Sequence, residues 1–104
     1  MRRTEGKCRI MKDLQETRRA LDAVDRQIVA LFEERMNLAR DVAEYKIAHG
    51  MAILDRSREE QVLDSRCAML EDAYWAPALR EMFEQLMALS RAEQQKMVEA
   101  NDHA

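Results

Sequence analysis

The chain has 104 residues, of which 36% are charged and 47% are hydrophobic, and its formal net charge is −3. This length suits one small domain, and the slightly acidic balance gives no reason to expect binding to nucleic acid. Residues 1–10 lack the apolar core of a signal peptide, and no stretch reaches the roughly 18 apolar residues that a membrane-spanning helix needs. We therefore expect a protein without nucleic-acid or membrane partners.

The domain is expected to span residues 12–101, between a disordered tail of residues 1–11 and a short tail of residues 102–104. The two cysteines, Cys8 and Cys67, show no metal-ligand spacing and are too few for a disulfide framework. We interpret them as free thiols in a reducing compartment, which predicts a cytoplasmic location.

Residues 12–49 contain neither proline nor glycine, and Gly50 then offers a stop, so one long helix is predicted. A helix of this length measures about 57 Å, whereas a compact domain of this size has a radius of gyration of about 13 Å. The apolar stripe along the helix therefore needs cover from outside the chain, and a second copy is the simplest partner. Its heptad-like positions are Leu14, Thr17, Leu21, Val24, Ile28, Leu31, Leu38, Val42 and Tyr45.

A short apolar connector, residues 51–54, precedes the second predicted helix, which begins at Asp55 or Ser57 and runs to about Asp72. Ser57 with Glu60 three residues later matches a capping box. Pro77 suits the first turn of a third helix that extends to about Asn101. The apolar face of this third helix comprises Leu79, Met82, Phe83, Leu86, Met87 and Met97. The sequence thus predicts an all-α fold with three helices.

Polar residues interrupt the apolar pattern of the long helix. Arg35 occupies the heptad slot between Ile28 and Val42, where a buried guanidinium requires an anionic partner. That partner is either a bound ligand or an internal carboxylate, and Arg35 also fits a register-setting role. Lys46 lies three turns beyond Arg35 on nearly the same side, although a solvated lysine is common near a helix C-terminus.

The third predicted helix carries Ser90 and Gln94 four residues apart on the extension of its apolar face, which indicates a polar pocket or, equally, a frayed helix end. The neighbouring residues Arg91, Glu93 and Gln95 are interpreted as surface residues.

Two arginines, Arg56 and Arg58, fall near the first turn of the second helix, where a bound anion or a surface salt bridge would compensate their charge. Arg18 lies 17 residues before Arg35, about 25 Å along the helix, so one small ligand cannot contact both from one chain. In an antiparallel dimer, Arg18 of the second subunit could complete a site around Arg35.

These polar positions resemble the motif of the small all-helical chorismate mutases. The spacing reads R-x6-D, then R ten residues later, K eleven after that, and D-x-x-R-E nine further on, followed by S-x-x-x-Q. The shared positions are Arg18, Asp25, Arg35, Lys46, Asp55, Arg58, Glu59, Ser90 and Gln94. The family's connector often carries a proline where this chain has Ala52, a departure expected to alter only loop stiffness. The resemblance implies an intertwined homodimer that forms a six-helix bundle with two equivalent sites.

The resemblance also implies the substrate, chorismate, and its rearrangement to prephenate on the route to phenylalanine and tyrosine. Arg35 and Arg18 of the partner subunit would clamp the two substrate carboxylates, with Arg58 and Ser90 assisting. Arginine suits this task because its planar fork pairs bidentately with carboxylates.

The remaining implied roles concern the ether and the ring hydroxyl of the substrate. Lys46 and Gln94 would donate hydrogen bonds to the ether oxygen, while Glu59 and the backbone at Asp55 would hold the hydroxyl. Asp25 is expected to be structural. The reaction is a unimolecular rearrangement. It needs the substrate to be held in its reactive conformer and the charge growing on the ether oxygen to be stabilised, but no nucleophile, metal or cofactor.

Two alternatives stay open. An isochorismate pyruvate lyase has the same fold and similar cations, but those relatives lack the acidic residue at Glu59, whose presence favours the mutase. A non-catalytic helical dimerisation module would explain the long stripe but not the polar residues Arg35, Ser90 and Gln94 on apolar faces.

Overall fold

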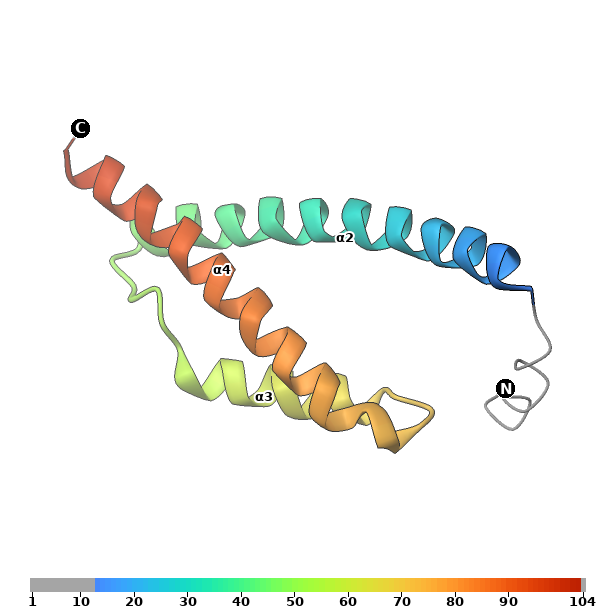
Figure 1. The fold of residues 1–104 in the computed structure, drawn as a ribbon. Coiled ribbons are helices and arrows are strands. Elements are labelled where there is room, and N and C mark those ends of the chain that lie inside the picture. Colours follow the sequence, from blue (N-terminus) through green and yellow to red (C-terminus); the bar gives the residue numbers. More distant parts are fainter. Residues whose placement is uncertain (1–12, 104) are drawn as a thin grey trace. The chain divides into compact units, whose positions relative to one another are not determined.

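The computed structural model describes residues 13–103, so the predicted tail of residues 1–11 and Cys8 lie outside the described part of the chain. Residues 13–103 contain the α-helices α2 (Leu14–Ala48), α3 (Arg56–Ala68) and α4 (Ala76–Asp102), with a short 3-10 helix, η2 (Ala73–Trp75), between α3 and α4 (Figure 1). No strand occurs in this range. The prediction of an all-helical chain with one very long helix is confirmed. None of the described helices is long and apolar enough to cross a membrane.

The long helix α2 ends through a glycine, as the sequence predicts. Gly50 has a positive φ of 64°, a backbone conformation that glycine adopts without steric penalty. The amide of Gly50 donates to the Ile47 carbonyl at 3.3 Å, and the amide of Met51 donates to the Lys46 carbonyl at 2.8 Å. This pair of bonds is the Schellman arrangement, which satisfies carbonyls that the end of a helix leaves without a partner.

Helix α3 starts directly after the first of its two predicted positions, Asp55, but its cap and its end differ from the sequence prediction. Asp55 is the N-cap, because its side chain accepts a 3.1 Å hydrogen bond from the amide of Arg58, so the predicted capping box at Ser57 is wrong. The helix ends at Ala68 instead of near Asp72. The Asp72 side chain accepts from the amide of Tyr74 at 3.0 Å and caps η2, a local bond that competes with continuing the preceding helix.

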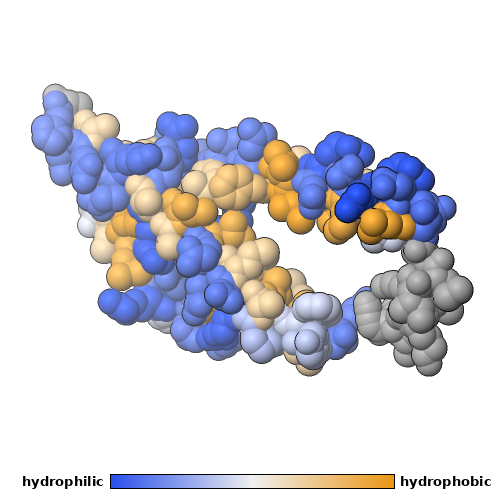
Figure 2. All heavy atoms as spheres, in the orientation of Figure 1, coloured by the Kyte–Doolittle hydropathy of each residue, from blue (hydrophilic) through white to orange (hydrophobic). Residues whose placement is uncertain are grey.

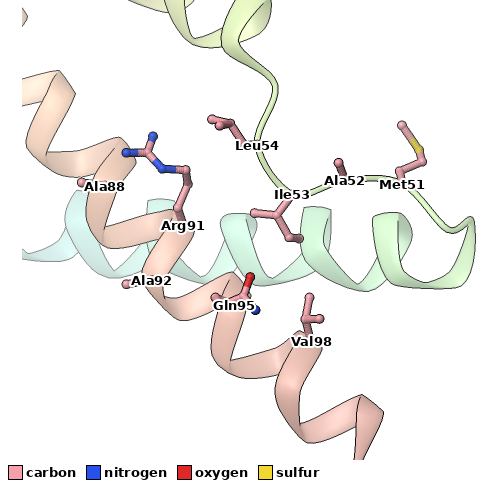
Figure 3. Close-up of a pocket in the computed structure, with 9 residues that line it drawn as sticks. All are labelled: Met51, Ala52, Ile53, Leu54, Ala88, Arg91, Ala92, Gln95 and Val98. Atoms are coloured by element: carbon pink, nitrogen blue, oxygen red, sulfur yellow. The ribbon is translucent and has the colours of Figure 1, made fainter.

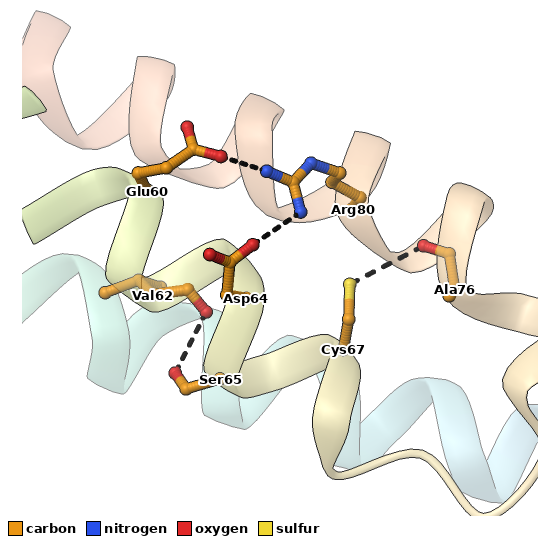
Figure 4. Close-up of polar contacts among 7 residues, drawn as sticks. All are labelled: Glu60, Val62, Asp64, Ser65, Cys67, Ala76 and Arg80. Carbon is orange, nitrogen blue, oxygen red and sulfur yellow. Dashed lines mark hydrogen bonds and ion pairs between the residues drawn. The ribbon is translucent and has the colours of Figure 1, made fainter. Parts of the chain in front are cut away.

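Helices α3 and α4 pack against each other around a small core. Val62, Leu63 and Met87 are buried there, and Phe83 packs against them. Arg80 on α4 reaches across to two acidic residues of α3, pairing with Glu60 and, at 3.1 Å, with Asp64 (Figure 4). These contacts fix α4 along α3.

Arg80 and Cys67 make polar contacts close to this core. The hydrogen bond with Asp64 and the nearby charge of Glu60 raise the pKa of Arg80 above its ordinary value. Cys67 is a free thiol, half-buried, and its Sγ donates to the Ala76 carbonyl at 3.6 Å (Figure 4).

The chain divides into two compact units, and the boundary after Arg35 falls within α2. In the first unit α2 leaves its apolar stripe uncovered; Leu31, for example, is 62% exposed. Figure 2 shows hydrophobic side chains gathered along one side of this helix. The exposed stripe residues of this unit are Leu14, Leu21, Val24, Ile28 and Leu31.

In the second unit, residues 36–104, the last turns of α2 pack on a different face. Ala43 is completely buried, whereas the stripe residues Leu38, Val42 and Tyr45 remain exposed. Because consecutive residues turn by about 100° around a helix, the packed face and the stripe are adjacent but distinct. Residues 13–103 thus cover one face of α2 and leave its heptad stripe exposed.

Candidate active site

Two polar side chains are buried in the middle of α4. Ser90 is 8% exposed and Gln94 is 7% exposed, one helical turn apart. The helix continues beyond them to Asp102, so the interpretation of this region as a frayed end is wrong. The burial of Ser90 and Gln94 agrees with polar residues on an otherwise apolar face, whereas the pocket expected at these side chains stays a prediction.

Both side chains face the packed side of α2. The Ser90 hydroxyl donates to the Leu86 carbonyl at 2.9 Å and lies 3.8 Å from the Met36 sulfur. The Gln94 amide donates to the Ala39 carbonyl at 2.7 Å. Ala43, one turn further along α2, is completely buried.

Lys46 lies on the same side of α2 as Ala39, two turns further on. It is half-buried, and its ammonium group donates a 2.8 Å hydrogen bond to the Ile53 carbonyl in the connector. The side chain therefore turns toward the start of α3 and is not a fully solvated lysine.

The first turn of α3 places three of the predicted residues together. Asp55 caps the helix, Arg58 is exposed and donates to the Gln61 side chain at 2.6 Å, and Glu59 is half-buried. Glu59 forms an ion pair with Arg91 on α4. The interpretation of Arg91 as a plain surface residue is wrong, because its side chain is only 35% exposed and spans two helices.

Glu93 also departs from its interpretation as a surface residue. Its side chain is 29% exposed and pairs with Arg40 of α2 at 3.7 Å. No spacing in the sequence distinguishes Arg91 or Glu93 from exposed charges, because both partners lie far away along the chain. Gln95 is exposed, as expected.

Two hollows adjoin these residues. One, of about 590 Å³, lies between the connector and α4; in Figure 3 the Ile53, Gln95 and Val98 side chains extend into the space between these two segments. Its lining comprises Met51, Ala52, Ile53, Leu54, Ala88, Arg91, Ala92, Gln95 and Val98. The other, of about 210 Å³, lies between α3 and α4, and its lining comprises Arg56, Glu59, Glu60, Leu63, Glu84, Met87 and Arg91.

The predicted site residues divide between the two units of the chain. Lys46, Asp55, Arg58, Glu59, Ser90 and Gln94 all belong to the unit of residues 36–104. Arg18, Asp25 and Arg35 belong to the first unit, where Arg18 and Asp25 are exposed and Arg35 is half-buried. The second unit therefore offers hydroxyl, amide and ammonium donors beside a paired carboxylate, a set suited to orienting a polar ligand by hydrogen bonds. Among the described residues, no group of three or more His, Cys, Asp or Glu side chains could hold a metal ion.

Comparison with known proteins identifies relatives of the chain. Residues 17–95 match the model of the family described as chorismate mutase type II. The chain is also 40% identical over 55 residues to a chorismate mutase of Methanocaldococcus jannaschii. That alignment covers 53% of this chain and 56% of the relative, so the match spans little more than half of the relative's length.

Proposed function

Because the chain belongs to the chorismate mutase type II family, we propose that it catalyses the rearrangement of chorismate to prephenate. The observation that carries this proposal is the pair of buried donors, Ser90 and Gln94, packed against the face of α2 that continues to Lys46. A purely structural helix pair gains nothing from burying polar side chains where apolar ones would pack as well. A site that must direct hydrogen bonds at a ligand requires them.

The reaction breaks a C–O bond and forms a C–C bond within one molecule. Negative charge grows on the ether oxygen as its bond to carbon breaks, and hydrogen-bond donors fixed in advance stabilise that charge. We assign this role to the Lys46 ammonium and the Gln94 amide. Glu59 accepts the hydrogen bond of the ring hydroxyl, and the backbone at Asp55 helps to hold this hydroxyl.

The two carboxylates of chorismate need cations, and we assign them to Arg35 and Arg18, assisted by Arg58 and Ser90. Holding both carboxylates keeps the flexible side chain folded over the ring, which places the reacting carbons in contact. The separation of Arg18 and Arg35 along α2 supports a site built by two subunits, with Arg18 of the partner subunit beside Arg35.

A homodimer accounts for the face of α2 that the chain leaves uncovered. Leu21, Ile28 and Leu31 are each more than half exposed, and a second α2 lying antiparallel would cover them. On the helical circumference, Arg35 lies at the edge of the stripe next to the face that packs on α4, and Lys46 falls between the stripe and that face. This position supports a site at the junction of the two subunits, within an intertwined six-helix bundle.

The direct test is an assay of the purified chain with chorismate and, separately, with isochorismate, following the loss of substrate absorbance and identifying the product. We expect conversion of chorismate to prephenate, and at most slow release of pyruvate from isochorismate. Faster turnover of isochorismate would assign the chain to the lyases of the same fold. Turnover of neither substrate would favour a non-catalytic dimerisation module.

A further inference from the structure

Arg91 connects the centre of α4 to the first turn of α3. It directly follows Ser90 in sequence, and its guanidinium pairs with the Glu59 carboxylate, 32 residues away along the chain. The side chains are 35% and 26% exposed, so the pair is partly shielded from water. We propose that Arg91 is a positioning residue, which holds Glu59 in the orientation that accepts the substrate's ring hydroxyl; this inference rests on the proposed function.

The position of Arg91 between the two hollows supports this role. Arg91 lines both the hollow between the connector and α4 and the hollow between α3 and α4. Figure 3 shows its side chain extending from α4 away from the end of the first hollow that Gln95 and Val98 line. Its guanidinium therefore lies where the start of α3 meets α4, beside the carboxylate that the reaction uses.

Charge balance gives a second reason for an arginine here. Chorismate is a dianion, and an uncompensated carboxylate beside it would repel it. The hollow between α3 and α4 is lined by three carboxylates, Glu59, Glu60 and Glu84, against two arginines, Arg56 and Arg91. A guanidinium paired with Glu59 offsets the negative charge and leaves further carboxylate lone pairs free for the hydroxyl.

A competing explanation is that Arg91 merely clamps α4 to α3. Arg80 provides the matched comparison, because it lies three turns earlier on α4 and pairs in the same way with Glu60 and Asp64 of α3. Arg80 is part of neither hollow's lining. A clamp role predicts that both arginines behave alike when replaced, whereas a positioning role predicts that only Arg91 affects turnover.

The experiment is a double-mutant cycle on the full chain. Arg91→Met keeps an unbranched apolar stem and removes the guanidinium charge, Arg91→Lys retains a cation, and Glu59→Gln removes the partner's charge. We expect Arg91→Met to lower kcat/KM about 10- to 100-fold, chiefly through kcat, because a misplaced catalytic contact costs about this much. Arg91→Lys should recover part of that loss. In the Glu59→Gln background, Arg91→Met should change kcat/KM by no more than about two-fold.

The control variant, Arg80→Met, should lower the urea midpoint of unfolding while keeping kcat/KM within about two-fold of the parent. Circular dichroism and sedimentation confirm that every protein compared is folded and assembled. Arg91→Gln replaces Arg91→Met if the methionine variant does not assemble.

Three results would overturn the inference. Full activity in Arg91→Met would show that Glu59 needs no help, and an equal loss in the Glu59→Gln background would show that Arg91 acts independently of Glu59. A loss confined to KM in both backgrounds would indicate direct contact with a substrate carboxylate. A parent protein without mutase activity would instead refute the proposed function, and this inference with it.

Discussion

The Gln94 side chain donates a 2.7 Å hydrogen bond to the main-chain carbonyl of Ala39, 55 residues earlier in the chain. The contact ties the middle of α4 to the packed face of α2 and holds the amide in a buried position. An amide held in this way is a directed donor that needs little reorganisation when a ligand oxygen approaches.

Gln94 gives the first prediction. An amide does not titrate, whereas a carboxyl group donates a hydrogen bond only when it is protonated. Gln94→Glu should therefore lose most activity at neutral pH and regain part of it on acidification, because protonation restores a donor and removes a repelling charge. Gln94→Ala should lose about 100- to 1000-fold in kcat at every pH. The measurement is the pH profile of kcat/KM.

The neighbouring Gln95 supplies the control, since it is exposed and carries the same side chain. Gln95→Glu should follow the pH profile of the parent. A Gln94→Glu profile that also runs parallel to the parent's would show that Gln94 does not face the breaking bond.

The second prediction concerns which subunit supplies Arg18 and which supplies Arg35 to a given site. Arg18→Ala and Arg35→Ala should each lose about 100-fold or more in activity, because each leaves a substrate carboxylate without its partner. After subunit exchange, a mixture of the two should recover about a quarter of the parent's activity, since about half of the dimers are mixed and each keeps one intact site. Absence of recovery after verified exchange would contradict a site shared between subunits.

The third prediction concerns the uncovered stripe of α2. Ile28→Glu places a charge on this stripe, where it would have to be desolvated on dimerisation, so we expect the dimer to dissociate and the chain to lose helicity with it. Sedimentation and circular dichroism at micromolar concentration measure both effects. Asn37→Glu adds the same charge to α2 at an exposed position away from the stripe and should leave the dimer intact. A folded, active monomer would refute the architecture.

The fourth prediction tests the start of α3. Asp55→Ala removes the side chain that caps the helix, so it should lower the free energy of unfolding by about 1 kcal/mol. Ser57→Ala should change it by no more than about 0.5 kcal/mol, because Ser57 does not cap the helix. Urea unfolding at one fixed protein concentration compares the two variants. Equal losses of unfolding free energy in the two variants would support the capping box at Ser57 that the sequence suggests.

The helices could be predicted because their signals are local. The run without proline or glycine up to His49 favours one continuous helix. Gly50 as a stop and Pro77 as a start each act within one helical turn, and the structure follows these signals. The sequence places the end of α3 too late. Asp72 can either continue a helix or cap the following turn, and the periodicity of the sequence does not distinguish these two outcomes.

The candidate site was predictable where polar residues interrupt an apolar face, as Ser90 and Gln94 do. Their partners were not predictable, because the Ala39 carbonyl and the Glu59 carboxylate come from distant segments, and their proximity depends on how closely the helices approach. Arg91 illustrates the limit: on a helix with many charges, nothing in its own spacing distinguishes it from its exposed neighbours.

The hydrogen bonds of Lys46 and Gln94 in the free chain have a consequence for the energetics of binding. One N–H of each group is directed at a peptide carbonyl, at 2.8 Å and 2.7 Å respectively. The Gln94 amide keeps one further N–H, and the Lys46 ammonium keeps two. The carbonyl acceptors therefore fix the direction of each group and leave N–H bonds for a second oxygen. An oxygen that gains negative charge accepts such bonds more strongly than a neutral ether, so on the proposed reaction these donors would bind the transition state more tightly than the bound substrate.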